Sequence, residues 1–258
     1  MPDVIIEKRG HTAVMTLNRS ETMNALCRSL IDDINCALDE IETDDDIYTV
    51  IITGTGKSFI SGADISEMVD MSPEEIMEWS GLGSRLNLRL EAMSLPVIAV
   101  INGHALGGGL ELALACDIRI ASQNARMGLP EVKLGVICGA GGTQRLPAIA
   151  GVSLAKEMLY TGRIIDADEA LKAGIISRIL PAEELLDGAM NIALSIERNG
   201  QLAVRAAKRA INFGRNSSIE DGCTFERKAF AALFDTEDQK IGMRGFLNKE
   251  KEIRFKNK

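Results

Sequence analysis

The sequence predicts an α/β fold, because short apolar segments alternate along the chain with longer amphipathic ones. Residues 4–8 and 12–17 alternate between apolar and polar side chains, as strands do, around a turn at Gly10. Apolar runs at residues 50–52 and 97–101 predict buried strands. The chain has 258 residues, 46% of them hydrophobic and 26% charged, which is ordinary for a soluble globular protein with a large core.

The helices of the first half are predicted from apolar spacing and from capping residues. Asn24 is expected to open a helix whose apolar side chains recur every three or four positions. The sequence Ser-Pro-Glu-Glu at residues 72–75 predicts the start of a second helix that runs to about Met93. A helix at residues 108–115 and a strand at residues 117–121 are expected next.

Helices dominate the predicted structure after about Gly141, with short extended pieces such as residues 175–180. Three segments carry an apolar stripe at helical spacing: residues 181–198, 201–213 and 218–234. A soft boundary at Asn199-Gly200 divides the chain into an α/β core, residues 1–199, and a helical region, residues 200–258.

The charge and the cysteine pattern exclude several classes of function. A net charge of −8 disfavours nucleic acid as the main partner, although a few local cations are enough for a phosphorylated ligand. Five cysteines without a C-x-x-C pair predict neither a disulfide framework nor a zinc site. Two histidines are too few for a His-rich metal site, and a Ser-His-Asp hydrolase is not credible. With no leader and no membrane-spanning apolar run, the sequence predicts a cytoplasmic protein without a membrane partner.

Two corners rich in small residues stand next to acidic side chains. Three glycines, residues 107–109, allow backbone N–H groups to approach a ligand with no Cβ in the way, which suits an oxyanion hole. A second corner, residues 61–65, follows the predicted strand at residues 48–53. Taken singly, each feature has a simpler explanation. The glycines could form only a tight turn, Glu111 could be a carboxylate in the first turn of a helix, and Glu131 could be an exposed acidic residue in a loop. Together they predict one site.

Several segments share their order and spacing with a known family. They are Ser61-Gly62-Ala63-Asp64-Ile65, the segment NGHALGGGLE at residues 102–111, Cys116-Asp117-Ile118-Arg119, Leu129-Pro130-Glu131 and Gly139-Ala140-Gly141-Gly142-Thr143-Gln144-Arg145. The chain thereby resembles the enoyl-CoA hydratase/isomerase (crotonase) superfamily, closest to its short-chain hydratases. The resemblance runs from end to end and includes Asn24-Ala25-Leu26 and a Phe246-Leu247-Asn248-Lys249 tail. It implies a crotonase-like (ClpP/crotonase) spiral of ββα turns, with residues 200–258 as a trimerisation region in a homotrimer or a dimer of trimers.

The resemblance also implies a reaction, the reversible hydration of a trans-2-enoyl-CoA to a 3-hydroxyacyl-CoA. CoA is then part of the substrate, and no separate cofactor is implied. Matched residue by residue, the backbone N–H groups of Ala63 and Gly108 would hold the thioester oxygen. Glu111 would act as the base on water and Glu131 as the proton donor to C2, although the sequence leaves their division of labour open. Isomerases of this family typically keep only the carboxylate that matches Glu131.

The same matching implies further contacts with the substrate. They involve Ser61, Gly62, Ala63, Asp64, Ile65, Gly108, Leu129, Gly139, Gly141, Phe246 and Lys249, with Lys249 facing a CoA phosphate that an adjacent subunit can hold. The segment 139–145 is expected to form a helix N-terminus that acts on the nearby water or on Glu131. Leu129 stands where many close hydratases have glutamine, and Met127 where an aromatic residue is frequent, so the acyl specificity stays open.

An acyl pocket is expected to be lined by Ile65, Met68, Met71, Trp79 and Leu82, although an amphipathic core helix explains these residues equally well.

Three functions remain in competition, and hydration of a trans-2-enoyl-CoA is the first. An isomerase, or a hydratase for a branched, cyclic or aromatic enoyl-CoA, is the enzymatic alternative. A crotonase-fold scaffold or RNA-binding protein is the non-enzymatic one, and both the acidic charge and the two glutamates disfavour it.

Overall fold

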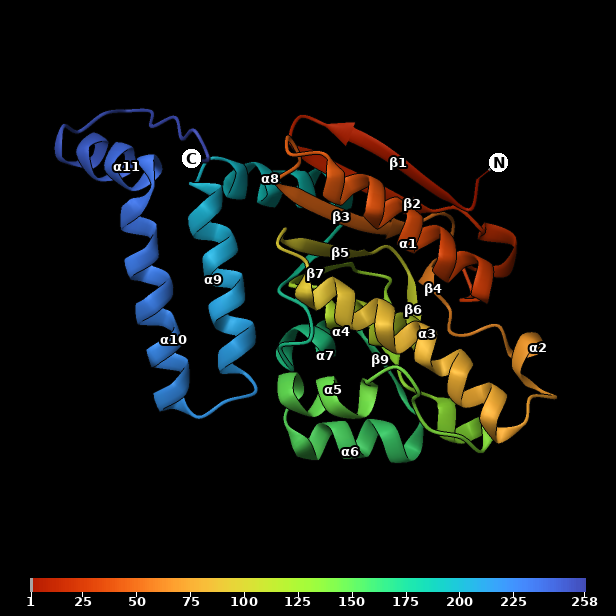
Figure 1. The fold of residues 1–258 in the computed structure, drawn as a ribbon. Helices are drawn as coiled ribbons and strands as arrows, with labels where there is room; N and C mark the ends of the chain where they lie inside the picture. The colour runs from red at the N-terminus through yellow and green to blue at the C-terminus, as the bar shows by residue number, and fades with distance from the viewer. Residues whose placement is uncertain (1) are drawn as a thin grey trace.

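A computed structural model describes residues 2–258, which form two sheets surrounded by helices (Figure 1). The larger sheet has the strand order β1-β2-β3-β5-β7-β10, and all its pairs except β1 with β2 are parallel. Its strands are β1 (Val4–Arg9), β2 (Thr12–Leu17), β3 (Thr49–Gly54), β5 (Val97–Ile101), β7 (Ile118–Ser122) and β10 (Arg178–Leu180). The smaller sheet consists of β4 (Ser58–Ile60), β6 (His104–Leu106), β8 (Arg126–Gly128) and β9 (Ile164–Asp166).

The chain winds through the two sheets as a spiral. Each of β3, β5 and β7 lies in the larger sheet and leads directly into a strand of the smaller one, β4, β6 or β8. A helical segment returns the chain to the larger sheet after β4 and after β6, whereas after β8 two α-helices lead to β9 of the smaller sheet before a third returns the chain to β10. The predicted α/β spiral of ββα turns is therefore confirmed.

Helices enclose the sheets and extend the chain beyond them (Figure 1). Those of the core are α1 (Arg28–Thr43), α2 (Ile65–Met68), α3 (Pro73–Ala92), α4 (Gly108–Ala115), α5 (Gly142–Ala150), α6 (Val152–Thr161), α7 (Ala167–Lys172) and α8 (Leu185–Glu197). The C-terminal ones are α9 (Gln201–Gly214), α10 (Ile219–Ala232) and α11 (Glu237–Leu247), which project from the core at the left of the view. Short 3-10 turns occur at Ser20–Thr22, Glu131–Leu134, Ala182–Glu184 and Leu233–Asp235.

The central strands β2, β3 and β5 of the larger sheet are buried on both faces, which explains their almost continuous apolar sequences. In β2, Ala13, Met15 and Leu17 join the main core with α1, α3 and α4. Val14, between them, points to the opposite face and packs in a second cluster with the buried residues of α8. The period of two along the strand therefore distributes neighbouring side chains between two cores.

Several helix boundaries follow the sequence prediction, and one does not. The capping box at the start of α3 is formed, with Ser72 and Glu75 bonded to each other's backbone N–H. The prediction that Asn24 opens a helix is wrong, because α1 begins at Arg28. Asn24 is buried, and its amide nitrogen donates to the carbonyls of Thr55 and Ser58. Its polar side chain therefore stabilises the turn after β3 instead of capping a helix.

The C-terminal helices are tied to the core by one buried cation. Lys208 of α9 donates to the carbonyls of Leu90 and Leu95 and pairs with Asp117 at 2.7 Å. These bonds satisfy all three donors of an ammonium group that would otherwise be costly to bury. The boundary at residues 199 and 200 stays a prediction; it falls between the end of α8 and the start of α9. Across residues 2–258, no helix combines the length and apolarity needed to cross a bilayer.

Candidate active site

Parallel pairing in the smaller sheet brings three chain corners to one edge. Strand β6 pairs with β4 on one side and with β8 on the other, and all three run in the same direction. The segments that follow them therefore leave from the same edge of the sheet. These segments are residues 61–65, the glycines at 107–109 and the acidic turn at Pro130-Glu131.

Two of these corners offer backbone N–H groups to the same space. Leu26 pairs with Ala63 as a parallel bridge, in which Leu26 donates to Gly62 and accepts from Asp64. That pattern points the N–H of Ala63 away from Leu26. Gly108 is the first residue of α4, where an N–H has no partner within the helix. Within residues 2–258 neither N–H makes a hydrogen bond, so both are free to hold an oxygen atom.

Gly107 fits its place because no other residue could occupy it without strain. Its φ of 51° lies in the left-handed region. A Cβ added there would lie 3.1 Å from Oε1 of Glu131. The missing side chain thus lets the carboxyl group of one corner approach the backbone of another.

Glu111 is held in one orientation by the turn before α5. The residue is 3% exposed, and its Oε1 accepts hydrogen bonds from Ala140 N at 2.8 Å and Gly142 N at 2.7 Å. Burial raises the pKa of the Glu111 carboxyl above its usual value, and these two bonds oppose part of that shift. The N–H groups at this helix start were expected to act on the nearby water or on Glu131, whereas they bind Glu111.

Glu131 lies across from Glu111 in a less enclosed position. Its Oε2 is buried and has no hydrogen-bond partner in the part of the chain that the structure describes. Burial raises the pKa of this carboxyl too, and the neighbouring Cys138 thiol opposes the rise. The charge of Glu131 in turn contributes to the raised pKa of Glu111. Two such carboxyl groups favour a state in which one is protonated and the other ionised.

Because burial raises the pKa of Glu111, replacing its carboxyl group with an uncharged amide is expected to stabilise the folded protein, by an amount that depends on pH. Above about pH 4.5 the unfolded chain releases this proton while the folded protein still holds it, so the free energy of unfolding falls as pH rises. We expect Glu111→Gln, whose amide oxygen can still accept both N–H bonds, to unfold at a higher temperature than the native protein at pH 8. The difference should shrink towards pH 4 in thermal melts followed by circular dichroism.

Glu75→Gln serves as the opposite control for this prediction. The Glu75 carboxylate accepts the Ser72 N–H, which lowers the pKa of Glu75, so its loss should lower the melting temperature at pH 8. If Glu111→Gln melts at or below the melting temperature of the native protein at pH 8, burial of the ionised Glu111 carboxyl does not lower stability, and the prediction is contradicted.

The three corners open into a cavity of about 830 Å³. Of the residues that the sequence assigned to the site, those at its wall are Ser61, Gly62, Ala63, Ile65, Gly108, Glu111, Glu131 and Gly139. The expected acyl-pocket residues Ile65, Met68 and Trp79 line it as well, whereas Met71 and Leu82 do not. Most of the remaining wall is apolar, as an acyl chain requires.

The other assigned residues lie elsewhere in the chain. Asp64 caps α2 by accepting from Ser66 N, and Leu129 is fully buried behind Gly142. Gly141 lines a separate cavity on the far side of its turn. Phe246 lies near the end of α11, where it is 79% exposed, and Lys249 follows that helix. This one chain therefore does not bring Phe246 or Lys249 to the cavity.

Sequence reasoning missed two features of the site. Cys138 lines the cavity beside both glutamates, and burial raises the pKa of its thiol, which keeps it protonated. Its only signal in the sequence is its position directly before Gly139. The use of Ala140 N and Gly142 N as donors to Glu111 left no signal at all. In residues 2–258, no cluster of three His, Cys, Asp or Glu side chains is arranged to hold a metal ion.

Comparison with known proteins gives the same family throughout. The sequence profile described as enoyl-CoA hydratase/isomerase matches residues 7–258. The short-chain-enoyl-CoA hydratase of Clostridium acetobutylicum is 46% identical over 257 residues, which are 99% of this chain and 98% of that protein. The crotonyl-CoA hydratase of Syntrophomonas wolfei is 46% identical over 250 residues, 96% of each chain.

Solved structures agree with the sequence comparison. The enoyl-CoA hydratase of Bacillus anthracis superimposes with a TM-score of 0.96 at 38% identity and covers 100% of both chains. A Geobacillus kaustophilus structure described as enoyl-CoA hydratase subunit I gives 0.95 at 39% identity and covers 100% of this chain and 99% of its own. Fold, sequence and the arrangement of the two glutamates lead to one assignment: this chain belongs to the enoyl-CoA hydratase/isomerase family.

Proposed function

We propose that this protein is an enoyl-CoA hydratase, which adds water reversibly to a trans-2-enoyl-CoA to give the 3-hydroxyacyl-CoA. One observation carries the proposal: Glu111 and Glu131, from two corners of the chain, line one cavity beside the free N–H groups of Ala63 and Gly108. Relatives that cover almost the whole chain and bear the names short-chain-enoyl-CoA hydratase and crotonyl-CoA hydratase support it.

In the proposed reaction the two N–H groups bind the thioester oxygen. They stabilise the negative charge that this oxygen gains when water attacks C3, without any reorganisation of the site. Glu111, held by two hydrogen bonds, accepts a proton from the attacking water. Glu131, whose pKa is raised by burial, gives a proton to C2 in its protonated form. A hydroxyl and a hydrogen are thereby added across the double bond, and CoA enters and leaves as part of the substrate.

The assay that tests this function follows the absorbance of the conjugated thioester. We expect the signal of crotonyl-CoA to fall on addition of the protein, and a series of longer, branched and aromatic 2-enoyl-CoAs to define the acyl specificity. No loss of absorbance with any of these would contradict hydration. Filter binding to RNA, run beside it, tests the non-enzymatic alternative.

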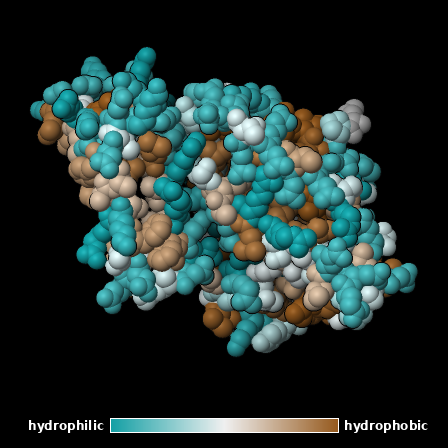
Figure 2. Space-filling model, viewed as in Figure 1, coloured by the Kyte–Doolittle hydropathy of each residue, from teal (hydrophilic) through white to brown (hydrophobic). Residues whose placement is uncertain are grey.

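We also infer that residues 200–258 assemble the hydratase as a trimer or a dimer of trimers. Helix α10 buries none of its residues within one chain, and Ile219, Phe246 and Leu247 are more than three-quarters exposed. Figure 2 shows hydrophobic surface gathered on these projecting helices at the left of the view. Apolar surface of this kind is typical of interfaces between chains.

All five cysteines are free thiols, which supports a reducing, cytoplasmic location.

This assembly gives the tail residue Lys249 a proposed role, pairing with a CoA phosphate held by an adjacent subunit. We expect Lys249→Ala to raise KM for crotonyl-CoA, to leave kcat unchanged, and to weaken the dependence of KM on salt. Lys172→Ala, at the exposed end of α7, is the matched control and should change neither. Light scattering should give a multiple of three chains of 27.9 kDa. A monomer would contradict the proposed assembly, and an unchanged KM for Lys249→Ala would contradict the proposed role of Lys249.

A further inference from the structure

The turn that holds Glu111 is itself held from behind. Along the chain, the carbonyl of Ala140 lies between the two N–H donors, Ala140 N and Gly142 N. It accepts hydrogen bonds from Arg145 Nη1 at 2.9 Å and from Asn87 Nδ2 at 3.0 Å. Because the peptide group is planar, holding this carbonyl fixes the plane of the Ala140–Gly141 peptide and so restrains the backbone between the two donors.

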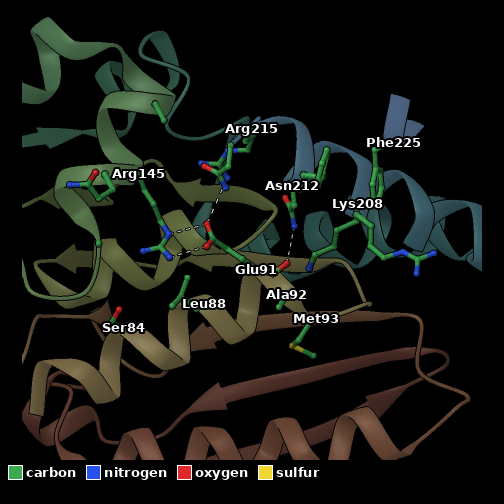
Figure 3. Close-up of a pocket in the computed structure, with 16 residues that line it drawn as sticks. Ser84, Leu88, Glu91, Ala92, Met93, Arg145, Lys208, Asn212, Arg215 and Phe225 are labelled. Atoms are coloured by element: carbon green, nitrogen blue, oxygen red, sulfur yellow. Dashed lines mark hydrogen bonds and ion pairs between the residues drawn. The ribbon is translucent and has the colours of Figure 1, made fainter. Parts of the chain in front are cut away.

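Arg145 can make this bond because a partner fixes the rest of its guanidinium. Its Nε and Nη2 donate to the two carboxylate oxygens of Glu91 at 3.0 and 2.9 Å, and Figure 3 shows this two-pronged pair. Nη1 is thereby left to face Ala140. Arg145 is only 8% exposed, and Glu91 faces Arg215 on its other side at 3.7 Å. A lysine could not bind the carboxylate in this two-pronged way and also reach the carbonyl.

Arg145 does not reach the cavity that contains the two glutamates. It lines a separate cavity of about 740 Å³ behind the turn, together with Glu91 and Arg215 (Figure 3). The turn is packed directly on the guanidinium, because a Cβ at Gly141, whose φ is 103°, would overlap Arg145 Nη1. Arg145 can therefore act on the reaction in two ways: through its contact with residues 140–142, and through its positive charge, which lowers the pKa of Glu111.

We propose that Arg145 is a positioning residue, which works with Glu91 and Asn87 to keep two backbone donors on Glu111. The proposal rests on the proposed hydratase function, because turnover reports the state of Glu111. Loss of Arg145 frees the turn and weakens the two N–H bonds that favour the carboxylate. The pKa of Glu111 then rises further, both because these bonds weaken and because the charge of Arg145 is lost, and the carboxylate is less well aimed at water.

The first experiment compares Arg145→Met with Arg145→Lys on crotonyl-CoA. We expect Arg145→Met to lower kcat on the order of 10- to 100-fold, the cost of a small misplacement of a reacting group. KM should stay within about twofold, since Arg145 does not line the substrate cavity. The acidic limb of the pH profile of kcat should move to higher pH. Arg145→Lys, which keeps the charge and one donor at a time, should recover part of kcat.

Arg89→Met is the matched control. Arg89 lies on α3 next to the same region and pairs with Asp39 and Glu42 of α1, but it does not contact the turn. It should leave kcat and the pH profile unchanged. If Arg145→Met fails to fold, Glu91→Gln replaces it, because it removes the charge that aligns the guanidinium; a pH profile unchanged by Glu91→Gln would overturn the proposal.

A double variant separates positioning from a general structural role. In a Glu111→Gln background the group that Arg145 positions has lost its function, so adding Arg145→Met should lower kcat by less than about twofold more. An equal loss in both backgrounds, or a rise in KM at constant kcat, would overturn the proposal. The unmodified protein is assayed first: no hydration there contradicts the proposed function, whereas normal hydration with an unaffected Arg145→Met contradicts only the role of Arg145.

Discussion

Glu111→Gln and Glu131→Gln are each expected to lower the rate of crotonyl-CoA hydration by at least about 100-fold, the usual effect of losing a general acid or base. Glutamine keeps the shape of each side chain and, at position 111, an oxygen for the Ala140 and Gly142 N–H groups. What it removes is the exchange of protons. The double variant should be about as slow as the slower single one, because groups that act together on one water lose their value together.

The same variants distinguish a hydratase from an isomerase. Moving a double bond needs only a proton carrier, so an isomerase acting through Glu131 would tolerate Glu111→Gln. Kinetics of both single variants and the double variant, on crotonyl-CoA and on a 3-enoyl-CoA, decide between them. Glu220→Gln, in the first turn of α10, is the control and should retain full activity. Unchanged hydration by Glu111→Gln would favour the isomerase.

Gly108→Pro is expected to lower kcat by about 10²- to 10³-fold, or about 2.7 to 4 kcal/mol, the loss seen when one donor of an oxyanion hole is removed. The structure makes this change unusually clean. Gly108 is the first residue of α4, a position at which proline fits helical backbone and removes only an N–H that has no partner in the helix.

Gly108→Ala is the matched control for the proline variant. Both place a Cβ at this position, about 3.0 Å from Leu26 Cδ1, but alanine keeps the N–H. The difference in kcat between the two variants therefore reports the replacement of the N–H by the proline ring, without the effect of the added Cβ. Circular dichroism should show both folded. A folded Gly108→Pro protein that turns over as fast as Gly108→Ala would show that this N–H does not hold the thioester oxygen.

Local patterns in the sequence were enough to predict most of the elements. The Ser-Pro-Glu-Glu start of α3 forms the capping box that it predicts, and α4 spans residues 108–115 as expected. Strands β2 and β5 also have the predicted bounds. These elements are encoded by caps and by side-chain period, which act within a few residues of each other and can be read along the chain.

The smaller sheet shows why the rest could not be predicted. Strands β4, β6, β8 and β9 have three residues each, too few to show a period, and exist only because each pairs with a segment distant in sequence. The corners that carry Ala63, Gly108 and Glu131 meet only through this pairing. The residue types predicted that these corners form one site, but the strand pairing that brings them together could not be read from residue patterns alone.

The sequence by itself determined which residue types were available for the chemistry: two carboxyl groups and two corners whose small residues leave backbone N–H groups accessible. Only the tertiary structure decided how they are used. It gave the donors at Ala140 and Gly142 to Glu111, turned the Leu129 side chain away from the cavity, and used Asn24 to hold a turn. The physical reason is that side-chain type is fixed locally, whereas burial, pKa and hydrogen-bond partners depend on which distant segments pack together.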